Sequence, residues 1–384
     1  MIKPETKIKP TCTIVSHTPY YRNKQGEYIG LNSTVEEIDE ISKLFNKVLH
    51  CAPLHAGIPP KSFINHQSKN ISVIPLIPAG GSNFMDKVSN IYFFPKNLKI
   101  IKFNLKNTEL LHFRAPTGLG VLFLPWIFLF WRKNLWIKYA GSWVDEKAPI
   151  SYKAQRMLLQ IFPKTAKVSI NGNYEKRRTN FLNFINPCFN TKNLKRANLI
   201  SSKKDFKSRL RLLFVGRLER EKGLDDIFSL LNSLESYDRI ESFIIIGDSA
   251  DFYKYEKLGK DLPFEVRILG ALPRKIVFEY YEKSDILLLL SKTEGFPKVI
   301  MEAGAFGCVP ILSRLPNFEL HINHGGNGII LQDQPYEESI STFQRIISDP
   351  DTLKRLSEGI TFTSKLFTYE NYLSSIKASI LNDQ

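Results

Sequence analysis

Two cations occupy a short loop after an apolar run that is typical of a buried strand. The segment LLFVGRLEREKGLDDI covers residues 212–227, and it places Arg217 and Lys222 between Gly216 and a predicted helix that begins at Leu224. Open α/β sheets bind ligands at the carboxyl ends of their strands. Arginine can bind two phosphate oxygens at once and lysine adds a point charge, so the pair suits a diphosphate. The loop lacks the Walker pattern, which disfavours ATP or GTP hydrolysis, and solvated loop charges are the alternative for this segment alone.

Two glutamates lie close to the start of a second predicted helix. The segment TEGFPKVIMEAGAFGCVPI covers residues 293–311 and follows the apolar run DILLLL. Glu294 falls in the loop, Pro297 suits the first turn of the helix, and Glu302 lies in its early part. Backbone N–H groups at this helix start can bind an anion, and the two carboxylates can accept hydroxyl groups of a sugar or ribose. Ordinary surface exposure is the alternative, which the strand, the proline and the small residues disfavour.

Together these segments resemble the carboxyl-terminal domain of family 4 retaining glycosyltransferases with the GT-B fold, of the bacterial polysaccharide type. The resemblance runs in consistent order from about residue 210 to 335, through IIIGD and LGALP. It implies that Glu294 contacts hydroxyls of the donor sugar and Glu302 contacts the ribose. Arg217 and Lys222 would hold the diphosphate and, with Glu294, form the catalytic set. The other donor-binding residues that it implies are Gly216, Asp248, Gly295, Phe296 and Pro297.

The first half matches the same family more weakly. LLHFRAP, residues 110–116, resembles the strand and loop that face the cleft in these enzymes, and WIKYAGSW, residues 136–143, resembles the next strand. Many relatives place a histidine in that second strand, and this chain has none there, so Lys138 or Ser142 is expected to substitute. A structural role is the alternative for His112. The predicted cleft contacts from the first domain are His17, His112, Arg114, Lys138 and Ser142.

The resemblance implies a hexosyltransferase-type enzyme that moves a sugar from a nucleotide-diphosphate-sugar to a saccharide or lipid-linked acceptor of a cell-surface polysaccharide. Cations and helix amides would stabilise charge on the leaving diphosphate. Retention by front-face attack needs no dedicated base. The sequence has no Asp-x-Asp motif in the relevant region, so we predict no metal, and no cofactor beyond the co-substrate. A GT-B isomerase (epimerase) acting on a nucleotide sugar is the alternative enzyme.

Apolar runs alternate with helical patterns along the chain, which predicts an α/β protein of two Rossmann-like domains facing across a cleft. The predicted divisions are an acceptor-binding domain at 1–190, a linker at 191–208, a nucleotide-sugar-binding domain at 209–360, and a C-terminal helix at 361–384 that crosses back to the first domain.

Predicted strands of the first domain are 11–16, 48–51, 71–77, 100–103, 110–113, 136–139 and 167–170. A polar loop is predicted at 17–30, followed by a helix capped by Ser33. Predicted strands of the second domain are 211–215, 242–246, 266–269, 286–290 and 309–312, with helices opening at Leu224, Tyr253, Arg274 and Pro297.

The length of 384 residues suits two domains, and positive charge is concentrated in the first half. Residues 1–200 hold 29 basic and 11 acidic side chains, whereas residues 201–384 hold 24 and 27. A basic half attracts nucleic acid, an acidic ligand or an anionic membrane. Because no nucleic-acid-binding motif is present, we expect no nucleic acid and favour an anionic membrane surface. A nucleic-acid-binding protein that uses the basic N-terminal half is the less favoured alternative function.

The sequence predicts a cytoplasmic protein on the inner face of the cell membrane. Residues 115–131 are uncharged, but two prolines and the short length argue against a transmembrane helix. The run is either a buried helix or a segment that dips into the membrane with Phe123, Trp126, Phe128 and Trp131 as anchors. The N-terminus lacks the apolar core of a signal peptide, and four scattered cysteines are typical of buried thiols in a reducing compartment.

Overall fold

The structure is a computed structural model of the 384 residues. It describes all of them except 1–8, 61, 82–83, 142, 144–147, 163–165, 172–178, 249–251, 296–297, 333–335 and 382–384. The chain divides into two compact units, one made of residues 1–184 and 373–384 and the other of residues 185–372.

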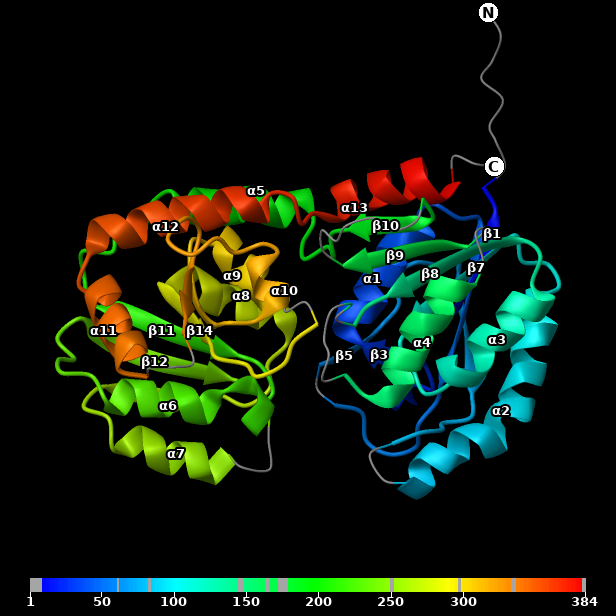
Figure 1. Ribbon diagram of the computed structural model, residues 1–384, viewed down its shortest axis with the longest axis horizontal. Coiled ribbons are helices and arrows are strands. Elements are labelled where there is room, and N and C mark those ends of the chain that lie inside the picture. Colours follow the sequence, from blue (N-terminus) through cyan, green and yellow to red (C-terminus); the bar gives the residue numbers. More distant parts are fainter. Residues whose placement is uncertain are drawn as a thin grey trace, which may run out of the picture. The chain divides into compact units, whose positions relative to one another are not determined.

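The first unit is built on a parallel sheet of seven strands in the order β10-β9-β8-β7-β1-β4-β6 (Figure 1). These strands are β1 (Thr11–Val15), β4 (Lys47–Pro53), β6 (Ile71–Leu76), β7 (Leu110–Ala115), β8 (Asn134–Tyr139), β9 (Lys167–Asn171) and β10 (Phe181–Phe184). A small antiparallel sheet joins β2 (Tyr20–Arg22), β3 (Tyr28–Leu31) and β5 (Phe63–Asn65). The helices are α1 (Asn32–Ser42), α2 (Phe84–Leu105), α3 (Gly120–Phe130) and α4 (Ile150–Ile161).

The two faces of this sheet differ in chemistry because side chains alternate along each strand. Leu111 and Phe113 of β7, with Ile137 and Tyr139 of β8, belong to the same apolar core as buried residues of α2, α3 and α4. The alternate positions of the same strands carry His112, Arg114, Trp136 and Lys138. This second face is polar and lies beneath α1, whose Glu37 is paired with both cations.

The second unit has a parallel sheet of six strands in the order β13-β12-β11-β14-β15-β16 (Figure 1). Its strands are β11 (Leu210–Val215), β12 (Ile240–Ile246), β13 (Glu265–Ile268), β14 (Ile286–Leu289), β15 (Val309–Ser313) and β16 (Ile329–Leu331). Its helices are α5 (Thr191–Ser201), η1 (Arg220–Lys222), α6 (Leu224–Asn232), α7 (Phe252–Lys260), α8 (Arg274–Lys283), α9 (Lys298–Ala305), α10 (Pro316–Glu319), α11 (Tyr336–Ile347) and α12 (Pro350–Ser364). Near the end of the chain lie α13 (Tyr369–Ile376), which spans the boundary of the two units, and η2 (Lys377–Leu381).

Several predicted elements are corrected by the structure. Residues 100–103, predicted as a strand, lie inside α2, where Ile101 and Leu105 are buried one helical turn apart. The predicted loop 17–30 contains β2 and most of β3. The first helix begins after Leu31, without a side-chain cap from Ser33. These errors share a cause, because short apolar runs and isolated polar residues do not fix the type of element.

The predicted linker at 191–208 also differs from the structure. Its first half is α5, which begins with a hydrogen bond from the Asn193 N–H to the side chain of Asn190. Leu194 and Ala197 of this helix are buried in the core of the second unit. The four cysteines are buried and free, as predicted. No helix within the described residues has the length and apolar character needed to cross a membrane.

Candidate functional site

The predicted donor site lies where the strand order of the second sheet reverses. From β11 the chain continues to β12 on one side, and β14 then pairs with β11 on the other side. Parallel sheets leave a crevice at such a switch point, beyond the carboxyl ends of the two central strands. Lys222 follows β11 and Glu294 follows β14. The topology therefore brings the two motifs that the sequence singled out to one edge of the sheet.

Gly223 explains how closely the two loops approach. Its φ of +70° is left-handed, and a Cβ there would overlap the backbone carbonyl of Leu290. Only glycine meets both conditions without strain. The loops are further joined by a hydrogen bond of 2.8 Å from the Lys292 N–H to the carbonyl oxygen of Glu221. The position of Lys222 is therefore fixed by backbone contacts on either side of it.

Lys222 and Glu294 form a close ion pair. The Lys222 Nζ lies 2.6 Å from Glu294 Oε1, and both side chains are largely buried. Ser291 donates a hydrogen bond of 3.0 Å to the same oxygen, and the side-chain amide of Asn317 donates to the backbone carbonyl of Glu294. Among the described residues these contacts do not use Oε2, which keeps its lone pairs available for a ligand hydroxyl. Sequence reasoning missed Ser291 and Asn317, although Ser291 follows directly on the apolar run of β14.

Arg217 and Glu302 do not take part in the Lys222–Glu294 ion pair. Arg217 lies in the loop after β11, but its side chain is 71% exposed and pairs with Glu219 at 2.8 Å. Glu302 is buried in α9, where Oε1 accepts from Arg274 at 2.7 Å and Oε2 accepts from Tyr281 at 3.2 Å. The structure thus brings Lys222 and Glu294 together and gives Glu302 separate partners. Arg274 had been predicted only as the start of a helix. Its position in the first turn of the helix that follows β13 is the signal that could have indicated a role at this edge of the sheet.

The other predicted donor residues lie in loops at the same edge of the sheet. Gly216 follows β11, and its carbonyl would collide with any Cβ on Gly247. The carbonyl of Asp248 accepts a hydrogen bond from Leu218 at 3.2 Å, and Gly247 donates to Gly270 at 3.0 Å. These contacts connect the loops after β11, β12 and β13. Gly295 follows Glu294 directly, whereas Phe296 and Pro297 lie outside the described residues.

The predicted contacts from the first unit have a different arrangement. Arg114 Nη1 and Lys138 Nζ each lie 2.7 Å from Glu37 Oε1, and the Lys138 side chain is only 2% exposed. His112 is fully buried, its Nδ1 lies 3.3 Å from the carbonyl oxygen of Trp136, and its ring stacks on that of Trp136. We therefore assign these three side chains to the interior beneath α1 and leave them out of the proposed site. Ser142 lies outside the described residues.

His17 alone among those five predicted residues lines a described cavity. This cavity of about 800 Å³ lies at the switch point of the first sheet, where β1 and β7 are neighbours. His17 follows β1, Pro116 and Thr117 follow β7, and His55 follows β4. Side chains from three helices complete the lining, and they include the apolar Ile91 and Ile150 as well as the polar Asn90 and Ser151. The cavity therefore has histidines at the strand ends and a mixed wall with apolar side chains on the helices.

A chain of buried hydrogen bonds supports the strand ends beside this cavity. Asp39 Oδ1 lies 2.9 Å from His66 Nδ1, and His66 Nε2 lies 2.7 Å from the hydroxyl of Tyr20. That hydroxyl is also 2.9 Å from His50 Nδ1, and His50 Nε2 lies 2.8 Å from Ser16 Oγ. Because a carboxylate can only accept, His66 Nδ1 donates to Asp39. Both imidazoles thereby have partners on both nitrogens, and the residue before His17 is held in place.

We expect the protein to lose stability as the pH falls below about 6.5, which is the ordinary pKa of a histidine side chain. Burial lowers the pKa of His50 and His112 well below that value, so both stay neutral in the folded protein. The unfolded chain then binds protons that the folded chain does not, which favours unfolding by about 1.4 kcal/mol per pH unit for each histidine. Urea unfolding at about pH 7.5 and about pH 5.5 and equal ionic strength measures this, and equal midpoints would contradict it.

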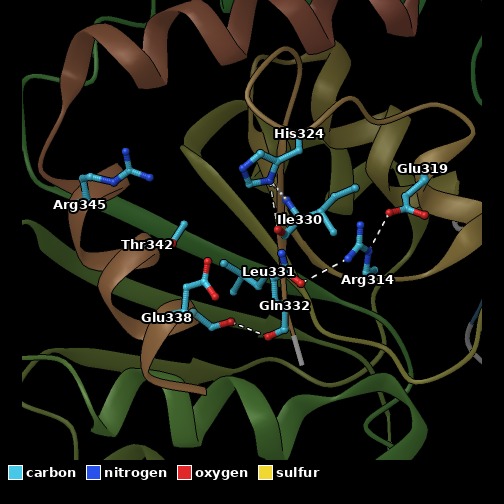
Figure 2. A pocket seen from close by; sticks show the side chains of 10 residues that line it. Arg314, Glu319, His324, Ile330, Leu331, Gln332, Glu338, Thr342 and Arg345 are labelled. Atoms are coloured by element: carbon cyan, nitrogen blue, oxygen red, sulfur yellow. Dashed lines mark hydrogen bonds and ion pairs between the residues drawn. The ribbon is translucent and has the colours of Figure 1, made fainter. Parts of the chain in front are cut away.

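A separate pocket of about 340 Å³ lies beside the edge strand β16 (Figure 2). Arg314 stands between Glu319 at 3.0 Å and Gln332 at 3.3 Å, and His324 Nδ1 contacts the backbone of Ile330 (Figure 2). None of the predicted donor residues lines this pocket, and Arg314, one of its two arginines, is paired with Glu319. Within the described residues, no three acidic, histidine or cysteine side chains are grouped so that they could hold a metal ion.

The class of protein is defined by its two doubly wound α/β units. Lys222 and Glu294 lie at the switch point of the second unit, and the cavity lined by His17 lies at that of the first. The structure matches sucrose-phosphate synthase from Thermosynechococcus elongatus with a TM-score of 0.71, 14% identity, and coverage of 98% of this chain and 100% of that chain. It matches a protein from Anabaena in complex with UDP and glucose with a TM-score of 0.67, 14% identity and coverage of 98% and 100%. The chain therefore has the GT-B fold of glycosyltransferases.

The sequence comparison finds a family that resembles most of the second unit. The family of glycosyl transferases group 1 matches residues 195–361, which is less than half of the chain. Alpha-monoglucosyldiacylglycerol synthase from Acholeplasma laidlawii is 29% identical over 174 residues, which cover 44% of this chain and 43% of that protein. The matched regions span less than half the length of the first curated relatives. Within the second unit, the matched residues include both Lys222 and Glu294.

Proposed function

We propose that this protein is a glycosyltransferase that moves a sugar from a nucleotide-diphosphate-sugar to an acceptor. The observation that carries the proposal is the Lys222–Glu294 ion pair at the β11/β14 switch point. It lies within the region that matches the group 1 family. The names of two similar proteins, a glucosyldiacylglycerol synthase and a protein in complex with UDP and glucose, agree with such a donor.

The proposed roles follow from charge and position. Lys222 supplies a cation beside the leaving diphosphate, and Arg217 can turn from Glu219 toward the phosphates because it is exposed. Oε2 of Glu294 accepts a hydroxyl of the donor sugar, while Oε1 keeps Lys222 in place. Glu302, oriented by Arg274, accepts a ribose hydroxyl with its remaining lone pairs. The further donor contacts that we propose are Gly216, Asp248, Gly295, Phe296 and Pro297.

The chemistry that we propose is transfer with retention, as in family 4 glycosyltransferases. Charge that develops on the leaving diphosphate is stabilised by Lys222, Arg217 and the amides at the start of α9. Lys222 and the helix amides are held in place before the reaction, so they need little reorganisation, whereas Arg217 turns toward the phosphates when the donor binds. We assign no general base, no metal ion and no further cofactor to this step.

The acceptor is proposed to bind in the cavity of the first unit. Its strand ends offer His17, His55 and Thr117 to saccharide hydroxyls, and the apolar side chains of its helical wall suit the chain of a lipid-linked saccharide. The product would be a growing saccharide of a cell-surface polysaccharide. Because nucleotide sugars are the donors, we place the protein in the cytoplasm, on the inner face of the cell membrane.

The direct test is donor binding. Saturation with the correct nucleotide sugar is expected to stabilise the folded protein by about 2.7 kcal/mol at a hundredfold excess over Kd, which raises Tm. Thermal unfolding with a panel of UDP-, GDP-, ADP- and dTDP-sugars measures this. The matched nucleoside monophosphates serve as the control, because they lack the second phosphate. If no nucleotide sugar raises Tm above its monophosphate, the proposed donor site is wrong.

Product analysis then separates transfer from isomerisation. A transferase forms a new glycoside and a nucleoside diphosphate only when an acceptor is present. An epimerase would convert the nucleotide sugar with no acceptor, and that result would replace the proposed activity with the alternative one.

A further inference from the structure

Three neighbouring helices of the first unit carry most of the exposed apolar side chains. Helix α2 contacts α3 and α3 contacts α4, and the three lie along one face of the sheet (Figure 1). Among the described residues, sixteen large apolar side chains are exposed, and ten of them are on these helices or directly after α4. They are Val88, Ile91, Tyr92, Phe103, Leu129, Phe130, Ile150, Met157, Ile161 and Phe162. With the cations described next, we call this surface the α2–α4 face.

Cations share the outer side of these helices with the apolar residues. Exposed residues at spacings of three or four follow one side of α2 and its last turn, namely Val88, Tyr92, Lys96, Lys99, Phe103 and Lys106. The outer side of α4 has the same pattern in Ile150, Lys153, Met157 and Ile161. Such spacing places residues on one helical side, and a side that faces only water would carry polar residues throughout. Arg132 and Lys133 add two exposed cations after α3.

The charge of this surface is one-sided. Among the described residues between positions 88 and 162, the exposed acidic side chain is Glu109, whereas the exposed cations are Lys96, Lys99, Lys102, Lys106, Arg132, Lys133 and Lys153. Several cations also lie over aromatic rings: Lys102 Nζ is 6.0 Å from the ring centre of Trp126, and Lys106 Nζ is 5.3 Å from that of Phe103. Aromatic rings beside long cationic side chains are typical of the boundary between lipid and water.

We infer that the α2–α4 face binds the surface of an anionic lipid bilayer. Exposed apolar side chains enter the boundary between headgroups and acyl chains, while the lysines pair with lipid phosphates. A second copy of the chain fits less well, because two faces with the same excess of cations repel each other. The anchors differ from those predicted from sequence: Phe123 is fully buried in the core, and the exposed side chains of α3 are Leu129 and Phe130.

The cavity of the first unit lies beside this face. Ile91 and Ile150 line the cavity and are also 64% and 86% exposed as members of the α2–α4 face. If the proposed function is correct, an acceptor with a lipid chain can therefore pass from the bilayer into the cavity along apolar side chains. Binding to the bilayer itself does not depend on catalysis, so it can be measured without a nucleotide sugar.

Vesicle co-sedimentation of the full chain tests the inference. Wild-type protein is expected to bind vesicles of phosphatidylcholine and phosphatidylglycerol at low salt, to bind phosphatidylcholine alone weakly, and to dissociate at high salt. The double variant Phe103→Ser/Lys106→Glu is expected to bind the anionic vesicles about tenfold or more weakly, since it loses an apolar anchor and reverses a charge. Both side chains are exposed, so its Tm should match that of the wild type.

The chain offers a closely matched control outside the α2–α4 face. Phe362 on α12 is 71% exposed, compared with 70% for Phe103, and Lys365 Nζ lies 5.6 Å from the centre of its ring. Phe362→Ser/Lys365→Glu should leave vesicle binding unchanged. The inference is overturned if the wild type ignores phosphatidylglycerol, or if both double variants bind equally. The inference is also overturned if Phe103→Ser/Lys106→Glu converts a dimer into a monomer and leaves vesicle binding unchanged. That result would identify the α2–α4 face as a contact between copies of the chain.

Discussion

Replacement of Glu294 by glutamine is expected to lower kcat/KM for sugar transfer by about a hundredfold, or about 2.7 kcal/mol of transition-state stabilisation. Glutamine keeps the shape of the side chain and can still accept from Ser291. It removes the negative charge that holds Lys222 Nζ at 2.6 Å, and it replaces a carboxylate oxygen that would accept a sugar hydroxyl. Steady-state rates with the donor identified by thermal shift measure the effect.

A matched control separates this effect from a general loss of charge. Glu358 on α12 is exposed and lies 3.8 Å from Lys354, so Glu358→Gln also breaks a Lys–Glu contact in the second unit. Exposed pairs of this kind contribute little, and we expect wild-type activity from that variant. Undiminished transfer by Glu294→Gln would remove the basis for the proposed site.

Arg217→Ala is expected to reduce turnover by well over tenfold if the arginine turns toward the phosphates.

The second sheet was readily predicted because its interior strands β11, β12, β14 and β15 are almost entirely buried. Runs such as LLFV and ILLLL are continuous and apolar, which is typical of the interior strands of a parallel sheet. Strand β16 was missed because it has only three residues at the edge of the sheet. In the first unit, α2 was misread at residues 100–103, since Pro95 interrupts the helical pattern and a short apolar run fits either type of element.

The candidate site was predictable as far as topology determines it. The two apolar runs were enough to expect that Lys222 and Glu294 each follow a strand, and the resemblance to family 4 glycosyltransferases implied that both contact one donor. The structure adds that the two strands are neighbours. The pairing of Glu302 with Arg274 depends on how α8 packs against α9, which sequence spacing does not reveal.

In the first unit, the direction of the predicted side chains could not be read from the sequence. Arg114 and Lys138 lie near the ends of β7 and β8, and His112 lies midway along β7. Alternation along the two strands turns all three toward the face beneath α1. The sequence alone did not indicate that Glu37, on the inner side of α1, would pair with two of them.

That pairing leads to the largest expected effect on stability. Glu37→Gln is expected to lower the free energy of unfolding by about 3–5 kcal/mol, because it removes the carboxylate that neutralises two enclosed cations. Lys138 and Arg114 each lie 2.7 Å from Glu37 Oε1, and the Lys138 ammonium has almost no access to water. A neutral amide accepts a hydrogen bond but does not balance either charge. Urea unfolding at neutral pH measures the loss.

Two further variants test whether the loss arises from an uncompensated buried charge. Glu40→Gln, on the same helix, breaks the 2.6 Å pair with the exposed Lys43 and should cost less than about 1 kcal/mol. Glu37→Gln/Lys138→Met removes the most enclosed cation together with its partner and should recover much of the stability, since replacing a whole buried pair is often nearly neutral. If the double variant is as unstable as Glu37→Gln, the carboxylate stabilises α1 through its other contacts, and charge balance beneath the helix is not the cause.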